Sequence, residues 1–377
     1  MGSVDRARAS GPGTAARRAE GVNLLALRSH NTALVLDLLR TAGAGGMSRL
    51  EMAERTGLSP QAVSKITTRL REEGLAAEAG RRASTGGKPQ TVLRLVPGAG
   101  HAVGMHLDRD ELRAALVDLD GNVVETRHAP LDLGAGAEAV VGAVVREAEG
   151  LGKAAAGALL GVGITLPGPL DHIHGILYRV TGFPEWESFP LRDELARRLG
   201  VPVVVDKDTN AAALGLAVGG ERGSFAYLHL GTGLGAGLVI GGRVHRGART
   251  QAGEFGHQVI QLGGPVCSCG NRGCIEALCL AAIERGDVAE AARVLGVGAA
   301  NLVKLLDMDR VLLGGRTVES APEVFVRGVA GVLDAQAAHE GTGEGVVPVG
   351  IAPGGAWGVA EGAAQLLLAP VFGRADG

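Results

Sequence analysis

The most informative stretch of this sequence runs Ala252-Gly-Glu-Phe-Gly-His257 and then Cys267-Ser-Cys-Gly-Asn-Arg-Gly-Cys274-Ile-Glu276. The spacing His-x9-Cys-x-Cys-x4-Cys offers one imidazole and three thiolates, which is a tetrahedral zinc set. The predicted ligands are His257, Cys267, Cys269 and Cys274. Because four protein ligands close the coordination sphere, we expect a structural Zn2+ rather than a catalytic one.

Two other interpretations of the cysteines stay open: a redox-active Cys-x-Cys pair, or reduced thiols without metal. Cys279 is a rival fourth ligand, but it lies among Leu278, Leu280 and Ala281 on an expected helix, which favours a buried core thiol. Three of the four cysteines fall within eight residues. That clustering is unlike a secreted disulfide framework and is typical of metal binding in a cytoplasmic protein, which is the location we expect.

Charge is distributed unevenly along the 377 residues, a length that suggests two or three domains. Residues 1–97 hold 15 Lys and Arg against 8 Asp and Glu, a net charge of +7, and the remainder has −10, which gives the total of −3. A basic head on an acidic body favours a polyanionic partner for the head. The sequence has no run of 18 apolar residues and no apolar segment near its start. We therefore expect neither a membrane span nor a secretory signal.

The first 97 residues predict a DNA-binding module. Residues 1–20 are expected to form a disordered basic tail, with a phosphate-binding arm as the alternative, and residues 21–97 a winged helix-turn-helix. A first helix begins near Asn23. A second follows the N-cap Ser48, with Glu51 completing a capping box, and a third follows Ser59-Pro60. The outward face of the third helix is expected to reach base edges in the major groove. The candidate contacts are Ser59, Gln61, Ala62, Ser64, Lys65, Thr68 and Arg69.

A wing is expected after this helix. Two short strands, 75–79 and 91–95, flank a flexible basic loop whose Arg81, Arg82 and Lys88 are candidates for phosphate contacts. The alternative is a small helical interaction domain with a solvated basic loop.

The body predicts an α/β protein. Apolar runs indicate strands at 102–107, 112–118, 123–127, 159–165, 201–205, 225–230 and 235–240, with a helix at 137–150. Hairpins followed by alternating helices and strands indicate α/β lobes.

The chain resembles the ROK family of repressors, open reading frames and sugar kinases. The cysteine segment carries the resemblance, and support comes from Gly161-Val-Gly-Ile-Thr-Leu-Pro-Gly-Pro-Leu-Asp171, Asp206-Lys-Asp-Thr-Asn-Ala-Ala-Ala213, Leu230-Gly-Thr-Gly-Leu-Gly-Ala-Gly237 and Leu312-Leu-Gly-Gly315. The resemblance implies an actin/hexokinase-like (ribonuclease H-like) body at 98–377. Lobe one would span about 98–208 plus the C-terminal helix, and lobe two about 209–355. The winged helix-turn-helix marks the repressor branch.

The resemblance also implies a sugar cleft between the lobes. The family's sugar contacts correspond to Gly168, Asp208, Glu254, His257 and Glu276, and in the kinases the residue matching Asp208 is the general base. The alternative interpretation of each carboxylate is an exposed turn residue without a role in binding.

Three features differ from the family's kinases. The phosphate loop Asp-x-Gly-Gly-Thr is replaced by a stretch containing His106, Asp108, Arg109 and Asp110, so we expect no kinase activity and regard Asp208 as a vestigial base. Where the family has an Asn-Asp pair, this chain has Lys207-Asp208, so a lysine replaces the amide. Only 39 residues separate Cys274 from Gly314, fewer than the family implies.

Lys207 supports two predictions. It either pairs with its sequence neighbours Asp206 or Asp208, or it reaches the cleft, where it would favour an anionic effector or fill the site itself.

We therefore expect a bacterial, sequence-specific transcriptional regulator of carbohydrate-related genes, acting as a repressor. It would bind double-stranded operator DNA as a homodimer or homotetramer, and a sugar or sugar phosphate would bind in the cleft. The alternatives are an ATP-dependent sugar kinase that also binds DNA, and a regulator without an effector.

Overall fold

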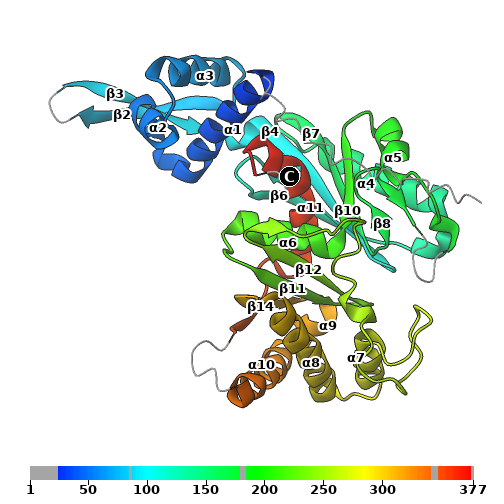
Figure 1. Ribbon diagram of the computed structural model, residues 1–377. Helices are drawn as coiled ribbons and strands as arrows, with labels where there is room; N and C mark the ends of the chain where they lie inside the picture. The colour runs from blue at the N-terminus through cyan, green and yellow to red at the C-terminus, as the bar shows by residue number, and fades with distance from the viewer. Residues whose placement is uncertain (1–23, 85–86, 179–183, 341–346, 375–377) are drawn as a thin grey trace, which may run out of the picture.

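The computed structural model describes residues 24–84, 87–178, 184–340 and 347–374, which form a head and two lobes (Figure 1). The predicted tail at 1–20 lies outside the described residues. In the part of the chain that is described, no helix combines the length and the apolar character needed to cross a membrane.

The head contains the expected helix-turn-helix. Its helices are α1 (Leu24–Ala42), α2 (Arg49–Thr56) and α3 (Pro60–Glu72). The capping box is confirmed: the Glu51 backbone N–H donates to Ser48 Oγ at 3.3 Å, and the Ser48 backbone N–H donates to Glu51 Oε2 at 2.7 Å. Ser59 caps α3 by accepting from the Ala62 N–H at 3.2 Å.

The hairpin after α3 is longer than predicted. Strands β2 (Ala76–Ser84) and β3 (Gly87–Leu95) pair antiparallel, and β3 also pairs with β1 (Met47–Ser48). The prediction of a loop from residue 80 onward was therefore wrong, because Arg81 and Arg82 lie within β2 opposite Thr91 and Gln90.

Lobe one is a five-stranded sheet in the order β10-β7-β4-β5-β6. Its strands are β4 (Gly100–Leu107), β5 (Glu111–Asp118), β6 (Val123–Pro130), β7 (Ala158–Leu166) and β10 (Val203–Lys207). Strands β7 and β10 run parallel to β4, whereas β5 and β6 are antiparallel. Helices α4 (Ala137–Gly152) and α5 (Leu191–Leu199) cover one face of the sheet, and α11 (Gly358–Val371) covers the other.

Lobe two repeats this architecture in the order β13-β12-β11-β14-β15. Its strands are β11 (Phe225–Leu230), β12 (Leu234–Ile240), β13 (Arg243–Val244), β14 (Arg310–Gly314) and β15 (Val349–Ile351). Helix α6 (Asp208–Gly219) covers one face, and the opposite face packs on α7 (Ile275–Glu284), α8 (Val288–Leu306) and α10 (Pro322–Glu340).

A short helix α9 (Arg316–Glu319) follows β14, and the two-stranded ribbon of β8 (Leu170–Asp171) and β9 (Ile176–Leu177) extends lobe one. Every predicted body element is present within three residues at each end.

Helices α6 and α11 lie between the two sheets (Figure 1). They approach so closely that a Cβ on Gly362 would lie 2.1 Å from the Ala211 carbonyl oxygen, and one on Gly215 would lie 3.0 Å from Gly362 Cα. Glycine is therefore required at this crossing. The head packs on the C-terminal part of α11, where Arg374 pairs with Asp37 of α1 at 2.8 Å.

Candidate functional site

The recognition surface is formed by α3 at the outer edge of the head, away from both lobes (Figure 1). Val63 and Leu70 are buried, whereas Gln61, Ser64 and Lys65 are exposed, as predicted. Six of the predicted DNA contacts line one open groove together with Asn31 and Thr32 of α1: Gln61, Ala62, Ser64, Lys65, Thr68 and Arg69. Arg69 also donates to Thr32 Oγ1 at 2.8 Å, so α1 helps to orient it.

The wing arginines differ in their surroundings. Arg82 pairs with Glu51 of the capping box at 2.7 Å, which ties the hairpin to α2. Arg81 is exposed on the same strand. The side chain of Lys88 lies outside the described part of the structure.

The predicted zinc ligands come together. The ligand atoms of His257, Cys267, Cys269 and Cys274 lie within 4.8 Å of one another. Cys267 Sγ is 3.6 Å from His257 Nδ1, and Cys269 Sγ is 3.7 Å from Cys274 Sγ. Metal–sulfur bonds of ~2.3 Å and metal–nitrogen bonds of ~2.0 Å in a tetrahedron require S···S and N···S separations of roughly 3.8 and 3.5 Å. The cluster therefore has the dimensions of a metal site.

Cys279 is not part of this cluster. It is buried in lobe two, and its thiol points to the Ala291 carbonyl oxygen at 3.6 Å. Burial raises the pKa of this thiol to about 12, which keeps it protonated. The prediction of a core thiol is confirmed.

A small cleft of about 80 Å³ lies between the lobes beside the metal cluster. All the predicted effector residues line it: Gly168, Lys207, Asp208, Glu254, His257 and Glu276. Because His257 turns Nδ1 to the cysteines, its Nε2 is the ring nitrogen left for a ligand.

Asp208 is the first residue of α6, where the helix dipole favours a carboxylate. Its Oδ1 accepts from the Thr209 N–H at 2.6 Å, and its Oδ2 lies 3.9 Å from His106 Nε2.

Glu276 is largely committed to protein contacts. One of its oxygens accepts from the Leu234 N–H at 2.8 Å, and the other accepts from Ser268 Oγ at 3.3 Å. It therefore links the metal loop to the start of β12.

The ammonium group of Lys207 pairs with neither sequence neighbour, so that prediction was wrong, although the Lys207 backbone N–H donates to Asp206 Oδ1 at 2.7 Å. Its Nζ donates to Glu254 Oε1 at 3.0 Å and to the Ala252 carbonyl oxygen at 2.5 Å, both in lobe two. Asp206 instead pairs with Arg246 at 2.7 Å. The second prediction, that the lysine reaches the cleft, is confirmed by its position in the lining.

Side chains also bridge the lobes at the end of the cleft where Asp108 and Asp110 lie. Thr232 Oγ1 donates to Asp108 Oδ1 at 2.7 Å, and Arg316 pairs with Asp110 at 3.0 Å. Burial alone would raise the pKa of Asp108, but His106, the hydrogen bond from Thr232 and the charge of Arg316 together lower it below its ordinary value. Asp108 therefore adds a negative charge at this end of the cleft.

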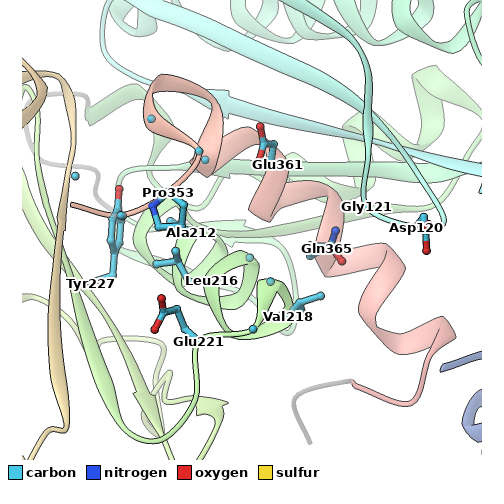
Figure 2. Close-up of a pocket in the computed structure, with 18 of the residues that line it drawn as sticks. Asp120, Gly121, Ala212, Leu216, Val218, Glu221, Tyr227, Pro353, Glu361 and Gln365 are labelled. Atoms are coloured by element: carbon cyan, nitrogen blue, oxygen red, sulfur yellow. The ribbon is translucent and has the colours of Figure 1, made fainter. Parts of the chain in front are cut away.

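A separate cavity of about 530 Å³ runs along α6 and α11 (Figure 2). Tyr227, Glu221 and Glu361 line it together with Asp120 of lobe one and Arg40 of the head. It contains none of the predicted effector residues.

Comparison with known proteins identifies the body and the head of the chain. Residues 102–286 match the ROK family, and residues 34–76 match a winged helix-turn-helix DNA-binding domain. The "DNA-binding transcriptional dual regulator NagC" of Escherichia coli K12 is 30% identical over 307 residues, which cover 79% of this chain and 71% of that protein. The chain belongs to the ROK family.

Other relatives agree with this membership. A "putative xylose repressor" of Caldicellulosiruptor sp. is 28% identical over 317 residues, covering 72% of this chain and 79% of the relative. The crystal structure of a ROK family transcriptional regulator, a homologue of the E. coli MLC protein, superimposes with a TM-score of 0.75 at 23% identity over 92% of this chain and 98% of that one. A ROK hexokinase from Thermus thermophilus matches with a TM-score of 0.58 at 32% identity over 72% of this chain and 99% of that one. With its winged helix-turn-helix, this ROK protein is a DNA-binding transcriptional regulator of the family's repressor branch.

Sequence reasoning missed the charged pairs that join the lobes, Asp206–Arg246, Lys207–Glu254 and Asp110–Arg316. A sequence offers one partial signal for them: charged residues at the ends of apolar strands, where burial requires a partner.

Proposed function

We propose that this ROK protein represses carbohydrate-related genes by binding an operator through its head, while its body senses a carbohydrate in the interlobe cleft. The observation that carries the proposal is the exposed polar face of α3 at the outer edge of the head, attached to a body of the sugar-kinase fold. The names of the repressor relatives support the same role.

The head would insert α3 into the major groove. Gln61 and Lys65 are suited to base edges, whereas Arg81 on the wing is suited to phosphates, which carry no sequence information. Two heads in a homodimer would bind two half-sites, and a homotetramer would pair two such dimers.

The cleft would hold the effector. Carboxylates of Asp208 and Glu254 accept hydrogen bonds from vicinal hydroxyls, and His257 Nε2 donates one when Nδ1 is bound to a metal. Zn2+ fits the set of one imidazole and three thiolates, and with four protein ligands it would supply structure rather than chemistry.

A kinase is the second candidate because Asp208 and the Gly231-Thr-Gly233 turn are retained at the cleft. Phosphoryl transfer depends on charge neutralisation at the phosphates. Asp108 and Asp110 place negative charge at one end of the cleft, and Arg316, a neighbouring cation, is paired with Asp110. We therefore propose that the protein does not phosphorylate sugars.

The experiment is operator selection from random duplexes with the full chain, followed by fluorescence anisotropy. Lys65→Ala and Gln61→Ala should each weaken binding to the selected site by about 1–3 kcal/mol and binding to unrelated DNA much less. Lys153→Ala, at an exposed lysine of lobe one, is the matched control. Equal affinity of all variants for the selected site would refute the proposal, and sugar-dependent ATP consumption in a coupled assay would favour the kinase.

A further inference from the structure

The ammonium group of Lys207 is buried inside the cleft. The residue is 3% exposed and ends β10 of lobe one, yet its Nζ reaches Glu254 Oε1 and the Ala252 carbonyl oxygen in lobe two. Its stem lies against Gly168, where a Cβ would be 2.9 Å from Lys207 Cδ. The lysine thus occupies the space between two of the predicted effector contacts.

The surrounding charges explain the choice of partner. Asp206 is already paired with Arg246, and Asp208 faces His106 and its own helix N-terminus. Glu254 is the carboxylate that remains beside the ammonium group, and it is partly exposed to the cleft. A sugar hydroxyl that donates to Glu254 must compete with an ion pair, which is the stronger interaction.

The free space in the cleft is also small with Lys207 in place. Ligand pockets usually measure roughly 300–1,000 Å³, whereas this cleft measures about 80 Å³. Lys207 takes up part of the cleft, because its side chain extends across the lining from Gly168 to Gly253.

We propose that Lys207 is an internal ligand that sets the specificity of the cleft. Its ammonium group satisfies Glu254 in place of a sugar hydroxyl and holds the lobes together, so a neutral sugar binds only by displacing it. This inference rests on the proposed function and identifies what controls the affinity of that site. An anionic sugar gains nothing from Lys207, because Glu254 already neutralises it, and Asp208 and Glu276 add further negative charge.

The test is calorimetric titration of the full chain with D-glucose, D-xylose, N-acetylglucosamine, gluconate and glucose 6-phosphate. Lys207→Asn removes the charge and the volume and should bind at least one neutral sugar ten-fold more tightly than the unchanged protein. Lys207→Met keeps the volume without the charge and should gain less than Lys207→Asn. Lys153→Asn, at an exposed lysine of the same lobe, should change nothing.

Three outcomes would overturn the proposal. The first is a neutral sugar that binds the unchanged protein as tightly as Lys207→Asn, and the second is a Lys207→Asn variant that gains no affinity for any sugar in the set. The third is tight binding of an anionic sugar that Lys207→Asn abolishes, since Lys207 would then recognise the effector.

A second measurement needs no variant. The chain has five lysines, and acetylation with mass spectrometry should modify Lys207 at least ten-fold more slowly than Lys153. Equal rates would contradict the buried ion pair. Operator binding is measured separately, so a protein that binds no specific DNA would fail the proposed function while leaving these two results intact.

Discussion

Replacing Thr232 by Val should loosen the contact between the lobes at Asp108. The Thr232 hydroxyl donates to Asp108 at 2.7 Å, and Asp108 is 6% exposed. A hydrogen bond to a charged group contributes about 1.5–3 kcal/mol. Because Asp108 keeps a second donor, the Arg109 backbone N–H at 2.8 Å, we expect the lower half of that range, about 1.5–2 kcal/mol.

Asp110→Ala provides the comparison. It removes the ion pair between Asp110 and Arg316, whose side chains are 61% and 39% exposed, and such pairs contribute ~0.2–1 kcal/mol. Urea unfolding followed by tryptophan fluorescence reports on both variants, because Trp186 is buried in lobe one and Trp357 precedes α11. A larger loss for Asp110→Ala than for Thr232→Val would refute the argument that burial decides the strength of these bridges.

The same carboxylate predicts a pH dependence. The pKa of Asp108 is lower in the folded chain than its unfolded value of roughly 3.9. Its stabilisation is therefore fully present above that unfolded value and is lost as the pH falls through the folded pKa. The stability difference between the unchanged protein and Asp108→Asn should be constant near pH 7 and shrink below about pH 4. A difference that does not change with pH would mean that Asp108 is not ionised in the folded protein.

Two further predictions concern the metal and the wing. Cys269→Ser should lose the near-stoichiometric zinc and unfold at a lower temperature, whereas Cys279→Ser should keep the metal. Inductively coupled plasma mass spectrometry measures the zinc content of both variants. Zinc retained by Cys269→Ser would remove Cys269 from the ligand set. Arg81 is exposed on the wing, so Arg81→Ala should weaken binding to all DNA sequences and reduce the slope of log affinity against log salt concentration by about one. Arg82→Ala should leave this slope nearly unchanged, because Arg82 is paired with Glu51. Equal slopes for the two variants would contradict this distinction.

Local sequence patterns predicted local structure well. The capping box depends on residues three positions apart, and the metal set depends on a short spacing within one loop, so both could be inferred without the fold. The strands of the body were predictable because their apolar runs are buried on both faces, as in β4.

The hairpin of the head shows where such inference stops. Residues 80–84 are polar and small and carry little strand preference, yet they are paired with β3. Arg82 contributes a tertiary contact to Glu51 that fixes the hairpin against α2. Tertiary pairing overrides the weak local preference, which is common for strands.

The bridges between the lobes could not be predicted for a different reason. Lys207 and Glu254 are 47 residues apart in sequence, and Asp110 and Arg316 are 206 apart. Each pair joins lobe one to lobe two, so the partner of each charge depends on the angle between two sheets. That angle is not encoded in any local pattern.

Helix α11 explains how the cleft and the head can influence each other. It crosses α6 at Gly362, and α6 begins at Asp208 in the cleft. Just beyond its other end, Arg374 pairs with Asp37 of the head. Because the contact at Gly362 leaves no space for even one methyl group, the two helices cannot slide freely past each other. The head therefore rests on a helix of lobe one that is in direct backbone contact with the helix that begins at the cleft.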